Sequence, residues 1–138
     1  MASKVKVKKT ALERFRKLAR ESKVEIQAYL LGNIVSPNLV VVTDFVYPKE
    51  YKAQTKTGVC WTGEEFSALK MRADFEGKNI VGDIHSHPNW FPIKSEPDHT
   101  AQIADQLRVC GICSVYGKKT YVRFWLAESS LPMEIIYK

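Results

Sequence analysis

Short apolar runs that alternate with helical segments are the feature that most limits the fold of this chain. The runs are rich in Val and Ile, which favour strands, whereas the helical segments place apolar residues three or four positions apart. Their order predicts β-α-β-β-α-β-α-β-β-β, an α/β (α+β) domain in which helices sandwich a mixed sheet. The predicted strands are 5–7, 24–35, 38–46, 79–86, 109–116, 120–127 and 133–137, and the predicted helices are 10–22, 62–77 and 96–107.

Local signals place several helix ends and turns. Thr-x-x-Glu sequences that begin at Thr10 and Thr62 predict capping boxes, in which the Thr hydroxyl and the Glu carboxylate bond the free N–H groups of a helix start. Gly77 predicts the end of the second helix. The turn residues 36–38 predict a hairpin. Residues 47–58 are polar and have no period, which predicts a long loop.

Length and composition are those of one domain spanning residues 1–138. Of these residues 45% are hydrophobic and 26% charged, which excludes a disordered or collagen-like chain. No stretch approaches the ~18 consecutive apolar residues of a membrane span, and the first residues lack the apolar segment of a secretory signal. An odd number of cysteines, three, is typical of a reducing compartment. We therefore expect a cytoplasmic protein without a membrane partner.

Basic residues are concentrated at the N-terminus. Residues 1–23 contain nine Lys or Arg and two Glu, a net charge of +7, whereas the whole chain carries +6. This patch could meet an acidic partner, an acidic membrane surface or nucleic acid, or it could be a solvated strand edge and helix face. The solvated face is favoured over nucleic acid, because neither interleaved aromatic residues nor a nucleic-acid motif accompanies the patch.

Two histidines flank one serine at the end of the predicted strand 79–86. Residues i and i+2 of a strand share a face, so His85 and His87 point to one place. Asp98 follows eleven residues after His87, which is enough chain to return a carboxylate to the strand end. Two imidazoles and a carboxylate suit a catalytic zinc ion with one open position. The alternative is an ordinary pair of polar residues at a strand end, followed by an ordinary helix residue.

A wider pattern surrounds the histidines and resembles the JAMM motif of the MPN-domain metalloproteases, H-[ST]-H-P-x6-S-x-x-D. Every defined position and spacing of that motif is present. The family also has a glutamate on the strand that follows the first helix, and Glu25 stands there. The motif residues are His85-Ser86-His87-Pro88 and, six residues later, Ser95-Glu96-Pro97-Asp98. The resemblance implies a single JAMM/MPN domain with a cytidine-deaminase-like fold.

The resemblance also implies a role for each motif residue. His85, His87 and Asp98 would bind Zn²⁺, with water in the fourth position. Glu25 would act as general base and then as general acid. Ser95 would donate a hydrogen bond to the developing oxyanion. Taken from the residues alone, Glu25 could instead pair with a lysine at a strand edge, and Ser95 could cap the third helix.

The best-known members of this family are deubiquitinases, and compact prokaryotic relatives process ubiquitin-like or sulfur-carrier proteins. The resemblance therefore implies a zinc isopeptidase that acts after the C-terminus of such a protein, and family members often work as dimers. Three alternatives stay open. The same chemistry could release a small amine from a sulfur-carrier tail or serve tail-assembly proteolysis, the domain could be a silent scaffold, or the basic N-terminus could associate with DNA.

Two segments are candidates for substrate binding. Loop 47–58 lies where family deubiquitinases clamp an extended substrate tail, although it could equally be a surface loop. Trp90 and Phe91 could form a substrate-facing wall or pack beneath their own loop. The candidate contact residues are Tyr51, Gln54, Thr55, Trp90 and Phe91.

Cys110 and Cys113 form a C-x-x-C sequence within a predicted strand. Residues i and i+3 of a strand point to opposite faces, so this pair suits neither a shared metal ion nor a disulfide. We expect both to be buried as small apolar side chains.

Overall fold

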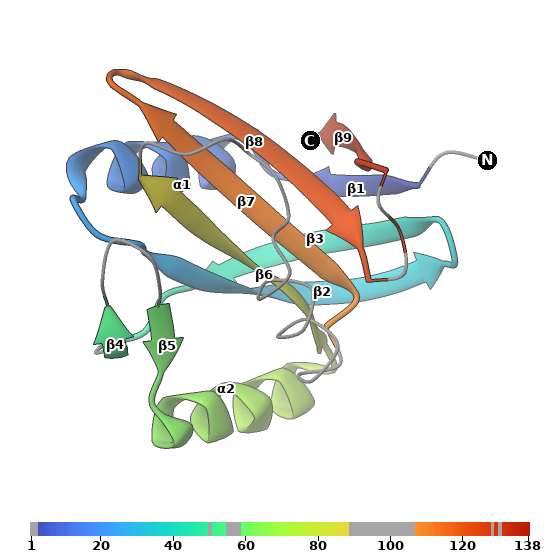
Figure 1. Ribbon diagram of the computed structural model, residues 1–138. Coiled ribbons are helices and arrows are strands. Elements are labelled where there is room, and N and C mark those ends of the chain that lie inside the picture. Colours follow the sequence, from blue (N-terminus) through green and yellow to red (C-terminus); the bar gives the residue numbers. More distant parts are fainter. Residues whose placement is uncertain (1–2, 50, 55–58, 89–106, 128, 130) are drawn as a thin grey trace.

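The computed structural model describes residues 3–49, 51–54, 59–88, 107–127, 129 and 131–138. Within these residues a seven-stranded sheet runs in the order β8-β7-β6-β2-β3-β1-β9 (Figure 1). Its strands are β1 (Lys4–Val7), β2 (Gln27–Ser36), β3 (Leu39–Val46), β6 (Asn79–Pro88), β7 (Val109–Tyr116), β8 (Lys119–Leu126) and β9 (Glu134–Tyr137). The pairs β1–β3, β1–β9 and β6–β7 are parallel and the other pairs are antiparallel, which confirms the predicted mixed sheet.

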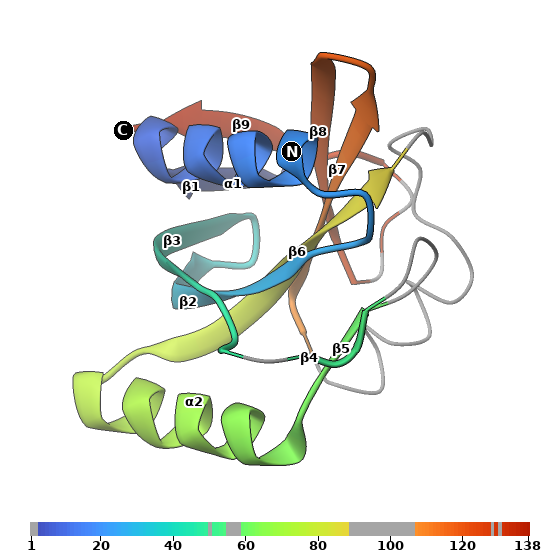
Figure 2. The same cartoon turned by 90° about the vertical axis from the view of Figure 1, so that its left-hand side faces the viewer.

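The described helices cover opposite faces of this sheet. In Figure 2, α1 (Lys9–Glu21) lies above the sheet and α2 (Gly63–Glu76) lies below it. The sandwich predicted from the sequence is therefore confirmed. Neither helix combines the length and apolar character needed to cross a bilayer.

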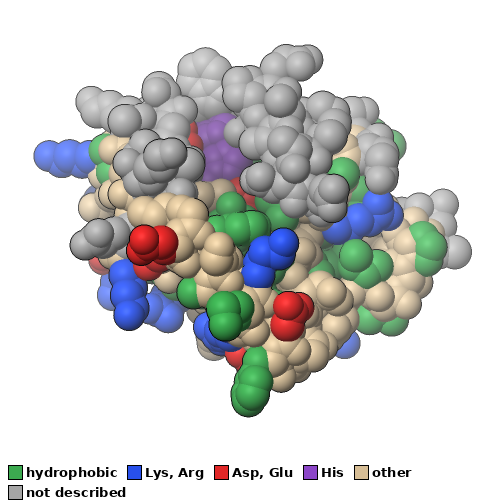
Figure 3. All heavy atoms as spheres, turned by 90° about the horizontal axis from the view of Figure 1, so that it is seen from below, with side chains coloured by type: hydrophobic (Ala, Val, Ile, Leu, Met, Phe, Trp, Pro, Cys, Tyr) green, Lys and Arg blue, Asp and Glu red, His purple; other side chains and the backbone are tan. Residues whose placement is uncertain are grey.

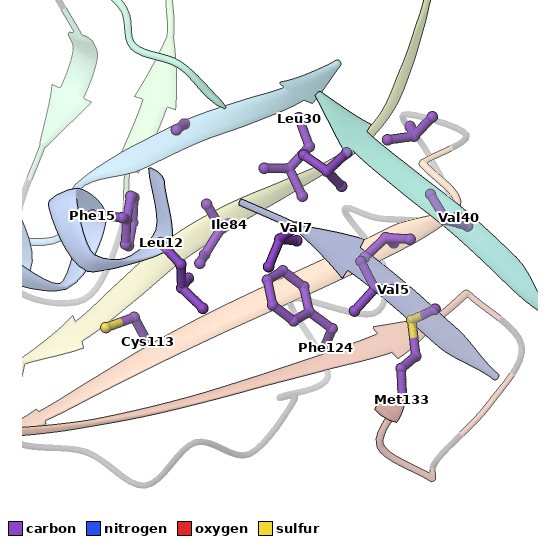
Figure 4. Close-up of a cluster of buried hydrophobic side chains, with 14 of the residues drawn as sticks. Val5, Val7, Leu12, Phe15, Leu30, Val40, Ile84, Cys113, Phe124 and Met133 are labelled. Carbon is purple, nitrogen blue, oxygen red and sulfur yellow. The ribbon is translucent and has the colours of Figure 1, made fainter. Parts of the chain in front are cut away.

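The face of α1 that meets the sheet carries the larger core. Leu12, Phe15 and Ala19 recur at helical spacing and are buried. Phe15 and Leu12 lie beside Ile84 and near Phe124, so one helix packs across several strands (Figure 4).

The α2 face of the sheet carries the smaller core. Leu69 and Ala73 of α2 are buried with Tyr29 and Leu31 of β2. The outer surface of this side mixes hydrophobic and charged side chains (Figure 3). Phe75 is 93% exposed and belongs to that outer surface.

The second helix has the ends that its sequence predicts. The Thr62 hydroxyl accepts the Glu65 backbone N–H at 3.2 Å, and Gly77 ends the helix with φ at +66°, in the left-handed region that suits glycine. The Glu65 carboxylate, however, accepts the Lys49 N–H at 2.6 Å. One half of the predicted capping box is therefore present, and the other half joins the helix to the preceding loop.

Two sequence predictions, the start of the first helix and the loop 47–58, are wrong in detail. The first helix begins at Lys9 and Lys8 gives no side-chain cap, because β1 ends at Val7 and only one residue separates the two elements. Thr10 therefore lies inside the first turn. The predicted loop 47–58 contains β4 (Tyr51–Gln54), which pairs with β5 (Val59–Trp61). These strands are too short to show a period.

The predicted strand 24–35 begins at Gln27, and the strand predicted to end at residue 86 continues to Pro88. Glu25 therefore precedes its strand, and His87 lies within a strand rather than a loop. The helix predicted at 96–107 lies outside the described residues except for Leu107, which is buried and outside any helix.

Candidate metal centre

Two histidine side chains of β6 meet on the face of the sheet that carries α2. The Nε2 atoms of His85 and His87 are 3.0 Å apart. Each residue is buried, with 7% and 8% of its surface exposed. Seen from the α2 side, histidine is visible between neighbouring residues (Figure 3). The i, i+2 spacing has thus brought two imidazole nitrogens to one point, as the sequence predicts.

Strand register brings Glu25 to the same point. β2 and β6 are antiparallel, and Gln27 is opposite His85. Because the two strands run in opposite directions, moving two residues back from Gln27 corresponds to moving two residues forward from His85. Glu25 is therefore beside His87. One carboxylate oxygen of Glu25 and one nitrogen of each histidine all lie within 4.8 Å of one another. Glu25 is itself 7% exposed.

Ser86 holds the segment that carries Glu25 against β6. Its hydroxyl accepts the Ile26 N–H at 2.9 Å, and its own N–H donates to the Ile26 carbonyl at 2.9 Å. Both backbone polar groups of Ile26 are thereby bonded to the residue between the two histidines. The serine of the motif, which is completely buried, therefore fixes the distance between Glu25 and the imidazoles.

The donor set and its spacing fit a zinc ion. Two nitrogens bound at ~2.0–2.1 Å to a tetrahedral zinc stand about 3.3 Å apart, close to the 3.0 Å between the two Nε2 atoms. Two imidazoles with a carboxylate form the ligand type of catalytic zinc sites. Glu25, His85 and His87 could therefore hold or face such a metal.

Five of the predicted site residues lie outside the described residues, and their assignments stay predictions. Asp98 is the third expected ligand and Ser95 the expected oxyanion donor. Thr55, Trp90 and Phe91 are the other three.

Tyr51 is fastened to β2 beside the metal centre. Its hydroxyl accepts the Gln27 N–H at 2.9 Å and donates to the Gln27 carbonyl at 3.0 Å. Burial raises the pKa of Tyr51, so the hydroxyl stays protonated at neutral pH. The hydroxyl thus anchors β4 two residues from Glu25, where the sequence predicts a substrate clamp. Gln54, at the end of β4, is exposed.

Three residues that the sequence did not single out for this site lie around His85. Asp83 shares its face of β6, and its Oδ2 lies 3.8 Å from His85 Nδ1. Gln27 Nε2 donates to the same Oδ2 at 2.6 Å. Cys110 is opposite Asp83 in the register of β6 and β7. The two-residue spacing that identifies His85 and His87 also reaches back to Asp83, so that signal was available.

The two cysteines of the C-x-x-C sequence lie on opposite faces of β7. Cys113 belongs to the core under α1, whereas Cys110 packs with Ile112 and Trp125. This separation confirms the prediction that they form neither a shared metal site nor a disulfide. Burial raises the pKa of Cys113 to about 12, which keeps it an unreactive thiol.

Comparisons with known proteins agree with this fold. Residues 8–128 match the model of a family described as prokaryotic homologs of the JAB domain. A solution structure from Desulfitobacterium hafniense superposes with a TM-score of 0.72 at 20% identity, over 97% of this chain and 92% of that chain. A solution structure from Salinibacter ruber gives 0.64 at 16% identity, over 96% and 91%. A comparison with curated proteins gave no match.

Proposed function

Because the chain belongs to the prokaryotic homologs of the JAB domain, a family with metal-dependent hydrolases and scaffolds, we propose that it is a zinc-dependent isopeptidase. It would hydrolyse the amide or isopeptide bond after the C-terminus of ubiquitin or a ubiquitin-like sulfur-carrier protein. The convergence of Glu25, His85 and His87 within 4.8 Å carries the proposal. A scaffold would have no need to bury these three polar groups together.

The ligands in this proposal are His85 and His87, through Nε2, with Asp98 as the third. Zinc bound there would lower the pKa of water from ~15.7 toward 7 and polarise the carbonyl of the scissile bond. Three protein ligands leave one position open, which is the arrangement of catalytic sites.

Glu25 moves the proton in this reaction. Its carboxylate takes a proton from the attacking water as the water oxygen bonds to the carbonyl carbon. It then gives that proton to the amine nitrogen as the carbon–nitrogen bond breaks. The two hydrogen bonds between Ser86 and Ile26 keep the Glu25 carboxylate within reach of the attacking water and of the leaving amine. The Ser95 hydroxyl donates to the carbonyl oxygen as negative charge develops, and such a donor is worth roughly 3 kcal/mol.

The substrate class rests on the motif resemblance and on the position of β4. Tyr51 holds β4 beside Gln27, two residues from Glu25. An extended substrate tail could add to such an edge through main-chain hydrogen bonds. The lysine to which the tail is joined would then lie on the other side of the metal centre from β4.

The test is cleavage of a ubiquitin-like sulfur carrier joined through its C-terminus to a lysine side chain. Zinc-loaded, chelated and zinc-restored protein are compared, with His85→Ala as the control that lacks one ligand. We expect cleavage that the chelator removes and zinc restores. Cleavage by chelated protein would contradict the zinc mechanism. Zinc binding without cleavage of this conjugate or of a small-amine adduct would favour a scaffold.

A further inference from the structure

Asp83 is a buried carboxylate that the motif and the proposed reaction leave unused. It is 8% exposed and precedes His85 by two residues on β6. Asp83, His85 and His87 therefore line one face of the strand. A buried carboxylate is costly unless charged or hydrogen-bonding partners surround it, so its partners indicate its use.

The ring of His85 turns one nitrogen to each neighbour. Its Nε2 faces His87 Nε2 at 3.0 Å, and its Nδ1 faces Asp83 Oδ2 at 3.8 Å. When a metal occupies one nitrogen of a neutral imidazole, the other nitrogen carries the proton. A carboxylate beside Nδ1 favours that arrangement, because it attracts the N–H and orients the ring. Metal-bound histidines in proteins almost always have such a partner.

Gln27 keeps Asp83 in place and in its accepting role. Its side-chain amide donates to Asp83 Oδ2 at 2.6 Å. Its backbone N–H and carbonyl are both bonded to the Tyr51 hydroxyl. A connected series of polar contacts therefore runs from Tyr51 of β4 through Gln27 of β2 to Asp83 and then to the imidazole of His85.

We propose that Asp83, held by Gln27, is a positioning residue that orients His85 and raises the affinity of the site for zinc. The proposal rests on the metal centre of the proposed function. It assigns to Asp83 a role through His85 and no contact with substrate.

Cys110 offers a competing use of the same atoms. One ligand atom from each of Asp83, His85 and Cys110 lies within 4.8 Å of the others, so a second metal ion on His85 Nδ1 is geometrically conceivable. The Gln27 amide argues against it, because its Nε2 already donates to Asp83 Oδ2, the carboxylate oxygen that faces His85 Nδ1. The experiment distinguishes the two by stoichiometry.

The test measures zinc affinity by competition with a chromophoric chelator. We expect Asp83→Ala to raise the zinc dissociation constant by about 10–100-fold, the usual effect of losing such a partner. Asp83→Asn, which keeps an acceptor oxygen, should raise it less. Gln27→Leu should raise it several-fold and add little in the Asp83→Ala background. In the NMR spectrum of zinc-loaded protein, the His85 Nδ1–H signal should exchange faster with water in Asp83→Ala.

Asp44→Asn is the matched control. Asp44 lies on β3, which β2 separates from the histidine strand β6, and it pairs with Lys78 at 2.7 Å. Its loss should therefore affect stability without touching the candidate metal centre. If Asp83→Ala does not fold, the zinc dissociation constants of Asp83→Asn and Gln27→Leu test the proposal instead. An unchanged dissociation constant in the folded variants would overturn the proposal. Two zinc ions per chain, one of them lost in Cys110→Ser, would also overturn it. Failure of the wild-type protein to bind zinc would instead remove the metal centre itself.

Discussion

The smallest scale at which the site is built is one hydroxyl group. Ser86 lies between the two histidines of the candidate metal centre, yet its hydrogen bonds go to Ile26. A strand alternates its side chains, so the histidines face α2 while Ser86 joins the opposite side of the sheet. A serine or threonine in this motif therefore has a structural reason: it attaches Glu25, the proposed general base, to β6, the strand of the two histidines.

Replacing Ser86 by alanine should lower both stability and turnover. The Ile26 N–H would lose its buried acceptor, at a cost of about 1–3 kcal/mol, and Glu25 would lose its fixed distance from His87. Ser86→Thr keeps the oxygen and should retain most of both. Urea unfolding and kcat, measured side by side, test this. An alanine variant with wild-type kcat would show that the Ser86–Ile26 bonds do not position Glu25.

Tyr47 predicts a loss of stability at alkaline pH. Among the described residues its buried hydroxyl has no hydrogen-bond partner. Burial raises the pKa of Tyr47 from 10.0 to about 12. Because the unfolded chain loses this proton first, the stabilising effect is complete below pH 10 and declines between pH 10 and about 12. Tyr47→Phe should reduce this decline in the free energy of unfolding, and an unchanged pH profile would contradict the assignment.

At the scale of elements, periodicity predicted the mixed sheet, the described helices and β6, the strand that carries the two histidines. It failed where a contact elsewhere in the chain decides the structure. The strand β4 depends on Tyr51 reaching Gln27, and four residues are too few to show a pattern. The Glu65 carboxylate accepts a hydrogen bond from the Lys49 N–H, which lies outside the start of its own helix. The two histidines were found because their spacing is local, whereas the pairing of Asp83 with Gln27 depends on strand register.

The closeness of β6 and β7 gives an element-scale prediction. A Cβ atom on Gly82 would lie 2.0 Å from the Val109 carbonyl oxygen. Gly82→Ala should therefore push the strands apart and destabilise the protein by about 1–3 kcal/mol. Gly63→Ala is the matched control, because nothing lies within 4 Å of its Cβ position at the start of α2. Thermal melting of both variants tests this, and equal melting temperatures would contradict the close approach.

At the scale of the whole molecule, the candidate metal centre joins distant parts of the sequence. Glu25 and His85 are separated by the β2–β3 hairpin, β4, β5 and α2. Helix α1, which carries several of the N-terminal basic residues, lies on the face of the sheet opposite α2 (Figure 2), so these charges would act on an acidic partner by long-range attraction rather than by contacts at the candidate metal centre.

Zinc should stabilise the folded chain, because the unfolded chain does not bring these residues together. At a zinc concentration 100 times the dissociation constant, the gain is about 2.7 kcal/mol. For a domain of this size the melting temperature should rise by roughly 5–10 °C. A chelator should reverse the shift, and a His85→Ala/His87→Ala double variant should not show it. An equal shift in that variant would place the zinc elsewhere.

The most direct test of the whole account compares wild-type protein with Glu25→Gln, each shown to carry zinc, on the ubiquitin-like–lysine conjugate. We expect the wild type to cleave the bond. Glu25→Gln should keep its zinc and its fold but cleave about 10²–10⁴-fold more slowly, since only the proton transfer is removed. Equal rates for the two proteins, or no cleavage by the zinc-loaded wild type, would contradict the assignment.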